Sequence, residues 1–97
     1  AQLTGEDAKA LPRQLDSLTR THKQYPDHLD VLIELSFATS RLKRHIQAYA
    51  LLASVKKVTP KHASRFFLAR AYALMGNKQY KEAADEARRA LQYAHAE

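Results

Sequence analysis

The stretch "LARAYALMGNKQYKEAADEARRAL", residues 68–91, predicts two helices joined by a tight turn. Gly76 follows an apolar run and suits the left-handed residue that often lies just past the end of a helix. Asn77–Gln79 then form the turn, and the segment that begins at Tyr80 carries carboxylates early and arginines late, which complements a helix dipole. The buried side of this segment consists of alanines, so we expect its partner helix to approach closely; these are Ala83, Ala87 and Ala90.

The chain as a whole has the composition of one all-α domain. It contains 97 residues, only two glycines and three prolines, and many good helix formers. Apolar periodicity and the breaks at Pro26, Pro60 and Gly76 predict about five helices, of which the last four span approximately residues 27–42, 46–58, 61–75 and 80–95. The first ends before Pro26. It begins either near Ala10, with Pro12 in its first turn, or near Thr4, with a kink at Pro12. The links are short, so we expect neighbouring helices to be antiparallel.

Several classes of site are disfavoured by what the sequence lacks. The absence of cysteine excludes disulfides, thiolate ligands and cysteine nucleophiles, and it fits cytosol and bacterial periplasm equally well. No apolar run approaches the ~20 residues of a membrane span. There is no glycine-rich phosphate loop and no HExxH motif, and no two histidines lie three or four residues apart. We therefore expect a protein without catalytic residues, metal or cofactor.

A repeat of helical hairpins is indicated by the spacing of Pro26 and Pro60. Each proline follows a predicted helix and is followed two residues later by a histidine, and the period from one to the other is typical of helical repeats. The first helices of the two hairpins align when Leu35 is matched with Leu68, whereas the second helices align when Ala48 is matched with Ala83. The second alignment is longer by two residues. We attribute the difference to two extra residues in the Asn77–Gln79 turn, because turns tolerate insertions.

The two hairpins resemble the tetratricopeptide repeat. The stretch "LIELSFATSRLKRHIQAYALLASVKKVTP", residues 32–60, carries its leucine, small-residue, alanine and proline positions, and residues 68–91 carry its leucine, small, tyrosine and alanine positions. The resemblance implies one domain over residues 1–97, with a capping or half-repeat helix at 1–25, a degenerate first repeat at 27–60 and a second repeat at 61–95. It also implies a short right-handed superhelix in which Tyr72 and Tyr80 fill the core beside Ala83.

The resemblance further implies a concave groove that binds an extended peptide or a helix of a partner. By their places in the pattern, the residues expected to line this groove are Ile33, Phe37, Ser40, Arg41, Phe66, Arg70 and Leu74. An apolar strip with arginine at its edges suits a partner segment that is apolar and acidic. The alternative is that Phe37 and Phe66 pack between helices, or against a further repeat outside this sequence. The predicted function is a non-catalytic interaction scaffold, a module of a larger protein or of an assembly or secretion complex.

The charge distribution adds a second candidate partner class. The net charge is +6, and no aspartate or glutamate occurs between Leu35 and Lys81. The predicted basic surface consists of Lys43, Arg44, Lys56, Lys57 and Lys61. A basic helical module that binds nucleic acid is therefore an alternative function, although these residues fall at turns and not along one recognition helix.

The last helix of the predicted array raises a third question. Terminal repeats normally need a covering helix, so Leu91 and Tyr93 are expected to be left exposed. We therefore expect either that a longer chain continues and covers this C-terminal helix or that two copies associate through it.

Overall fold

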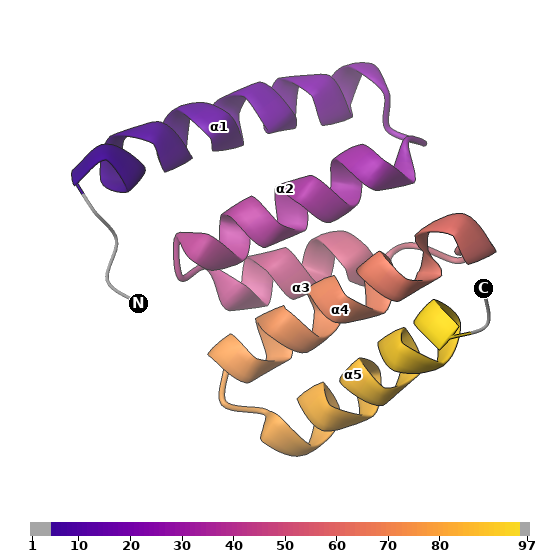
Figure 1. Ribbon diagram of the computed structural model, residues 1–97. Helices are drawn as coiled ribbons and strands as arrows, with labels where there is room; N and C mark the ends of the chain where they lie inside the picture. The colour runs from indigo at the N-terminus through magenta and orange to yellow at the C-terminus, as the bar shows by residue number, and fades with distance from the viewer. Residues whose placement is uncertain (1–4, 96–97) are drawn as a thin grey trace.

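The computed structural model describes residues 5–95, and this part of the chain folds into five α-helices without a strand (Figure 1). The helices are α1 (Gly5–Gln24), α2 (Leu29–Arg41), α3 (His45–Ala53), α4 (Pro60–Gly76) and α5 (Tyr80–His95). The predicted all-α class with about five helices is confirmed. Residues 1–4 and 96–97, at the two ends of the predicted domain, lie outside the described residues.

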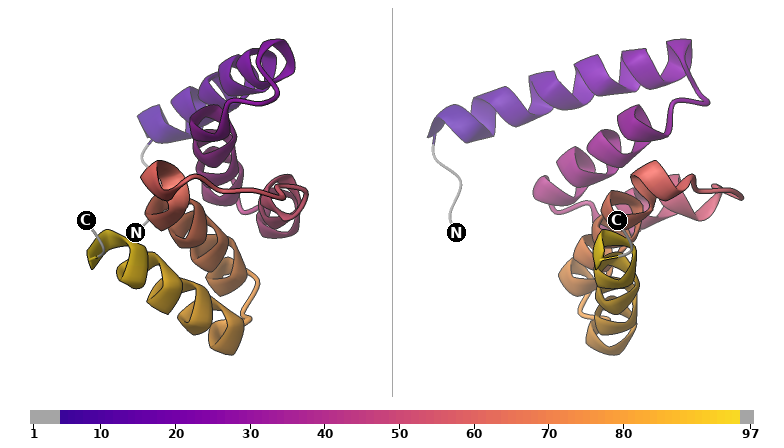
Figure 2. Two further views of the ribbon diagram at one scale, coloured as in Figure 1. Left: turned by 90° about the vertical axis from the view of Figure 1, so that its right-hand side faces the viewer. Right: turned by 45° about the vertical axis from the view of Figure 1, so that its right-hand side comes forward.

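The core lies where α2, α3 and α4 meet. Each of these three helices packs against the other two, whereas α1 packs on α2 and α5 packs on α4. In the left-hand view of Figure 2, α1, α2, α4 and α5 follow one another down the picture, and α3 lies to the right. The buried core cluster consists of Leu32, Ile33, Leu52, Phe66 and Ala69. The hydroxyl of Ser36 donates a hydrogen bond of 3.0 Å to the carbonyl of Ala48, which fixes α2 against α3.

Helix α3 is shorter than the sequence predicts. It ends at Ala53, five residues before the expected end at Val58, and residues 54–59 are not helical. Thr59 is extended, with ψ 148°, as the residue before a proline prefers to be. Pro60 opens α4 in its first turn, where its missing N–H leaves no hydrogen bond unmade. The β-branched Val58 and Thr59 thus belong to a non-helical link.

The two hairpin turns correspond residue for residue. Lys43 and Lys78 both adopt the left-handed conformation, with φ 62° and 63°. The N–H of Lys43 donates to the carbonyl of Ser40 at 2.8 Å, and that of Lys78 donates to the carbonyl of Met75 at 3.0 Å. Matching Lys43 with Lys78 requires the same shift along the chain as matching Ala48 with Ala83 in the second helices. The predicted two-residue insertion in the Asn77–Gln79 turn is therefore wrong, and the misalignment lies in the first helices.

The role predicted for Gly76 is also wrong. Gly76 is the last residue of α4, it has no positive φ, and Lys78 takes the left-handed position instead. Glycine is needed at this position for close packing, because a Cβ atom on residue 76 would overlap the imidazole ring of His45 from α3. The missing side chain thus allows the start of α3 to approach the end of α4.

The contact between Gly76 and His45 predicts that Gly76→Ala changes the free energy of unfolding in opposite directions with and without the imidazole ring. Gly76→Ala is expected to lower the free energy of unfolding by about 1–2 kcal/mol, because the added methyl group overpacks the contact. In a His45→Ala background the ring is absent, and the same substitution should raise the free energy of unfolding by up to about 1 kcal/mol, since alanine is the better helix former. Urea denaturation of the four proteins measures both effects. A Gly76→Ala protein as stable as the parent would show that the ring does not lie against the helix end.

Candidate functional site

Four of the seven predicted groove residues lie in the interior of the protein. Ile33 and Phe66 are exposed by only 0% and 2%, and Ser40 and Leu74 are also buried. These side chains form the contacts among α2, α3 and α4, so they are out of reach of a partner in this conformation. Phe37 and Arg41 keep exposed area on α2.

The side of α4 that faces solvent is rotated by about half a turn around the helix axis from the side that was predicted to do so. The predicted alignment matches Ile33 with Phe66, whereas the alignment observed at the turns matches Ile33 with Leu68. The large apolar residues that α4 presents to solvent are Leu68, Tyr72 and Met75, which are exposed by 50%, 46% and 60%. The prediction that Tyr72 and Tyr80 fill the core is therefore wrong, since Tyr80 is exposed by 63% as well.

Large apolar side chains meet across the boundary between α2 and α4. The rings of Phe37 and Tyr72 pack edge to face, with their centroids 6.0 Å apart and an interplanar angle of 69°. Leu68 and Met75 lie four residues before and three residues after Tyr72, so all three share one side of α4. We call the surface formed by Phe37, Leu68, Tyr72 and Met75 the α2–α4 face.

Charged side chains border the α2–α4 face. Glu34 of α2 forms an ion pair with Arg65 of α4, and the two side chains are about half exposed. A pair this exposed contributes little to stability, but it helps to hold the two helices in one register. Arg41 lies one turn beyond Phe37, at the C-terminal end of α2, and is exposed. The apolar area is therefore flanked by an internally neutralised pair on one side and a cation on the other.

Arg70, predicted to contact a partner, ties three helices together. Its guanidinium donates a hydrogen bond of 2.9 Å to the hydroxyl of Tyr49 on α3 and lies 3.2 Å from the carboxylate of Glu86 on α5. It also lies 5.2 Å from the ring centroid of Tyr49 and 5.6 Å from that of Phe66. These are contacts to this chain's own core, and they assign Arg70 a structural role.

The five residues of the predicted basic surface are all exposed, but they do not form one stripe. Lys43 and Arg44 lie in the turn before α3, whereas Lys56, Lys57 and Lys61 lie after it. Helix α3 therefore has a basic group at each end.

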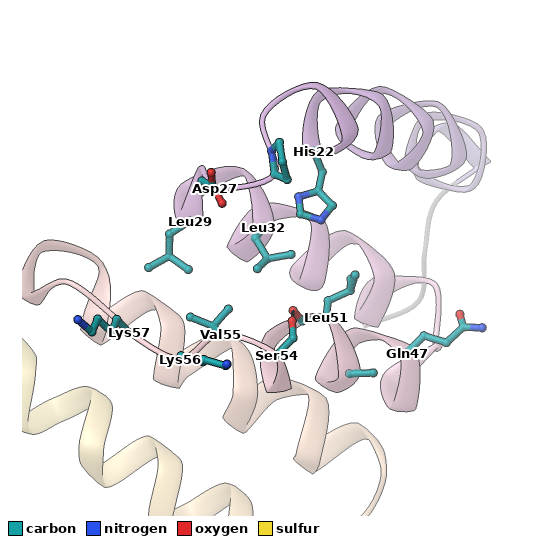
Figure 3. A pocket seen from close by; sticks show the side chains of 12 residues that line it. His22, Asp27, Leu29, Leu32, Gln47, Leu51, Ser54, Val55, Lys56 and Lys57 are labelled. Atoms are coloured by element: carbon teal, nitrogen blue, oxygen red, sulfur yellow. Dashed lines mark hydrogen bonds between the residues drawn. The ribbon is translucent and has the colours of Figure 1, made fainter.

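A groove that the sequence did not indicate separates α1 from α3 (Figure 3). It contains a cavity of about 710 Å³, whose apolar lining includes Leu29, Leu32, Leu51 and Val55. A second cavity of about 290 Å³ is also lined by α1, α2 and α3 and shares His22, Gln47 and Leu51 with the first. We call these two cavities together the α1–α3 groove.

The C-terminal helix leaves part of its surface open. As predicted, Leu91 and Tyr93 are exposed, by 58% and 42%. The ring of Tyr93 also stacks on that of Phe67, with centroids 5.5 Å apart. Self-association through α5 stays a prediction.

Two further observations bear on ligands and membranes. Among the side chains that the structure describes, those of residues 12–94, no three from histidine, aspartate and glutamate gather in a way that would hold a metal ion. None of the helices within residues 5–95 combines the length and the apolar character needed to cross a bilayer.

No protein-family model, curated protein or solved structure matches the chain. The α2–α4 face and the α1–α3 groove each offer apolar area beside charged groups.

Proposed function

We propose that the protein is a non-catalytic protein-interaction module that binds an apolar and acidic segment of a partner on the α2–α4 face. The observation that carries this proposal is the exposure of Leu68, Tyr72 and Met75 side by side on one helix, in contact with Phe37 of another. Contiguous apolar patches on soluble proteins are a mark of interaction sites, whereas isolated exposed apolar residues are common. Aromatic residues and methionine are also enriched in the cores of interfaces.

Two tetratricopeptide-like hairpins, α2–α3 and α4–α5, are the architecture that we propose for this module. The matching turns around Lys43 and Lys78 support it. The packing of α2 and α3 against α4, and of α4 against α5, is also what stacked hairpins require. In such a stack the first helices of successive units lie side by side, and here these helices are α2 and α4. Helix α1 then takes the place of a half unit.

The charges around the α2–α4 face favour a partner with carboxylates. Arg65 is already paired with Glu34, whereas Arg41 forms no ion pair within the described residues. Lys61 precedes Arg65 by one turn on the same side of α4 and is exposed. A partner segment with apolar side chains over Tyr72 and a carboxylate toward Arg41 or Lys61 would match this arrangement.

A peptide-display selection on the purified protein tests the proposed function. We expect the selected peptides to combine apolar and acidic residues, and we expect the variant Phe37→Ser/Tyr72→Ser to weaken their binding at least about tenfold, as for residues in the centre of an interface. The matched control is Ile46→Ser, which removes an apolar side chain exposed by 71% outside this face. Thermal unfolding confirms that each variant is folded.

Two outcomes of this selection would contradict the proposal. The first is a peptide family that binds the folded double variant as tightly as the parent protein. The second is that no peptide is enriched, while nucleic acid added to the selection as a competitor does bind the protein. That result would favour the alternative that the basic residues contact phosphates.

A further inference from the structure

We propose that the α1–α3 groove is a second and independent docking site, which binds an acidic amphipathic helix of a partner protein. The proposal does not depend on the function assigned to the α2–α4 face. It rests on the shape of the groove, on its apolar floor and on the charges at its rim.

The shape of the groove suits a helix. Helix α2 packs against both α1 and α3, but α1 and α3 do not pack against each other, so the two helices form walls on either side of α2. A channel with helical walls and a helical floor is the geometry in which amphipathic helices are commonly bound. Helix α3 has nine residues and is therefore about 13–14 Å long, which matches two to three turns of a bound helix.

The floor of the groove is apolar. Leu32 and Leu35 come from α2, and Leu51 comes from α3 and lines both cavities. Val55 extends this lining into the link after α3, and Figure 3 shows it facing Leu29 and Leu32 of α2 across the open space. A partner helix with leucine-sized residues on one side would cover this area.

The rim of the groove is basic. Lys56 and Lys57, after α3, lie at one end of the groove, while Arg44, before α3, lines the smaller cavity at the other end. Lys23 also lines the smaller cavity and follows His22, which lines both cavities. Asp27 is the only carboxylate among the residues that line the two cavities in the described part of the chain. An acidic helix would therefore meet cations at both ends. A second copy of this chain is disfavoured, because its net charge is +6.

A protein helix fits the groove better than nucleic acid does. The cations occupy the two ends of an apolar channel, and a phosphate backbone would leave the leucines of the floor uncovered. The groove is also separate from the α2–α4 face, because Leu35 and Thr39 lie about half a turn from Phe37 around α2. Both sites can therefore be occupied at once.

The test uses a designed probe. This probe is a labelled helical peptide of about 14 residues, with leucines at positions i, i+3, i+4 and i+7 and glutamates elsewhere. A second peptide keeps the leucines and carries lysine in place of every glutamate. Fluorescence anisotropy is measured with both peptides and with a duplex DNA, at about 50 mM and about 300 mM salt.

The expected result is binding of the glutamate peptide alone, weakened at the higher salt concentration. Lys56→Glu/Lys57→Glu should weaken this binding at least about tenfold. Lys78→Glu/Lys81→Glu, which makes the same charge change near the start of α5, should leave it within about twofold. Val55→Ser, which removes part of the apolar floor without changing charge, should weaken it severalfold. The variant Phe37→Ser/Tyr72→Ser should bind the peptide as the parent does, which separates this site from the α2–α4 face.

The proposal is overturned if the two lysine double variants weaken binding equally, since the attraction would then depend on net charge alone. It is also overturned if the lysine peptide binds as well as the glutamate peptide, or if Phe37→Ser/Tyr72→Ser abolishes the binding. Tighter binding of the DNA, lost on Lys56→Glu/Lys57→Glu, would reassign the basic rim to nucleic acid.

Discussion

Replacing Phe66 by alanine is expected to lower the free energy of unfolding by about 3–5 kcal/mol, the range for a buried aromatic residue. Phe66 is exposed by only 2% and belongs to the cluster shared by α2, α3 and α4. Its ring also packs edge to face on that of Phe67, with centroids 5.3 Å apart. Urea denaturation followed by circular dichroism measures the effect.

Tyr72→Ala is the matched control for this prediction. The tetratricopeptide pattern places this tyrosine in the core, whereas the structure leaves it half exposed with an edge contact to Phe37. We therefore expect its replacement to cost about 1 kcal/mol or less, the size of one aromatic pair. If Tyr72→Ala cost as much as Phe66→Ala, α4 would have to present a different side to the core.

The second large effect is expected at the ion pair between α4 and α5. Arg70→Met should lower the free energy of unfolding by about 3 kcal/mol, the low end for breaking a buried pair, because the arginine side chain keeps 23% exposure. The reason is the carboxylate of Glu86, which is 10% exposed and has one oxygen, Oε2, buried without a hydrogen-bond partner. Without Arg70, the cation that remains paired with the Glu86 carboxylate is the guanidinium of Arg89, at 3.8 Å.

Two further variants separate this explanation from a general loss of charge. Arg88→Met removes an exposed arginine from its pair with Asp85 and should change stability by less than about 0.5 kcal/mol. Arg70→Met/Glu86→Leu removes both buried charges and should recover part of the loss. A double variant that is less stable than Arg70→Met alone would show that the stranded carboxylate is not the cause.

The helices were predictable because strong local signals mark their ends. Pro26 and Pro60 interrupt the apolar pattern, and the short polar links leave little freedom in connecting one helix to the next. The end of α3 was missed because Val55 and Val58 continue an apolar pattern after the helix has stopped. Periodicity alone does not show that these two residues lie in a non-helical link.

The exposed side of α4 was harder to predict, because this helix is apolar almost all the way round. Both Phe66 and Leu68 are strong candidates for the core, so only contacts with other helices decide between them. A signal was nevertheless present in the small residues. The step along the chain from Ser36 to Ala48 equals the step from Ala71 to Ala83. That equal spacing matches Ser36 with Ala71, which is the alignment that the turns confirm.

The α1–α3 groove has no signature in the sequence. It arises because α1 and α3 flank α2 without touching, and this depends on the angles between helices that are not neighbours along the chain. Arg44, Lys56 and Lys57 at its rim belong to the predicted basic surface, but Lys23 does not, and the arrangement of these residues around one channel was not predicted.

The central claim is that the α2–α4 face binds a partner segment, and the absence of cysteine allows it to be tested directly. Single-cysteine variants Met75→Cys and Ala84→Cys place a bulky maleimide label on this face or on an exposed position of α5. We predict that labelling at position 75 weakens binding of the selected peptides at least about tenfold, or ~1.4 kcal/mol, and that labelling at position 84 leaves it within about twofold. Equal affinities for the two labelled proteins, or a loss only at position 84, would contradict the claim.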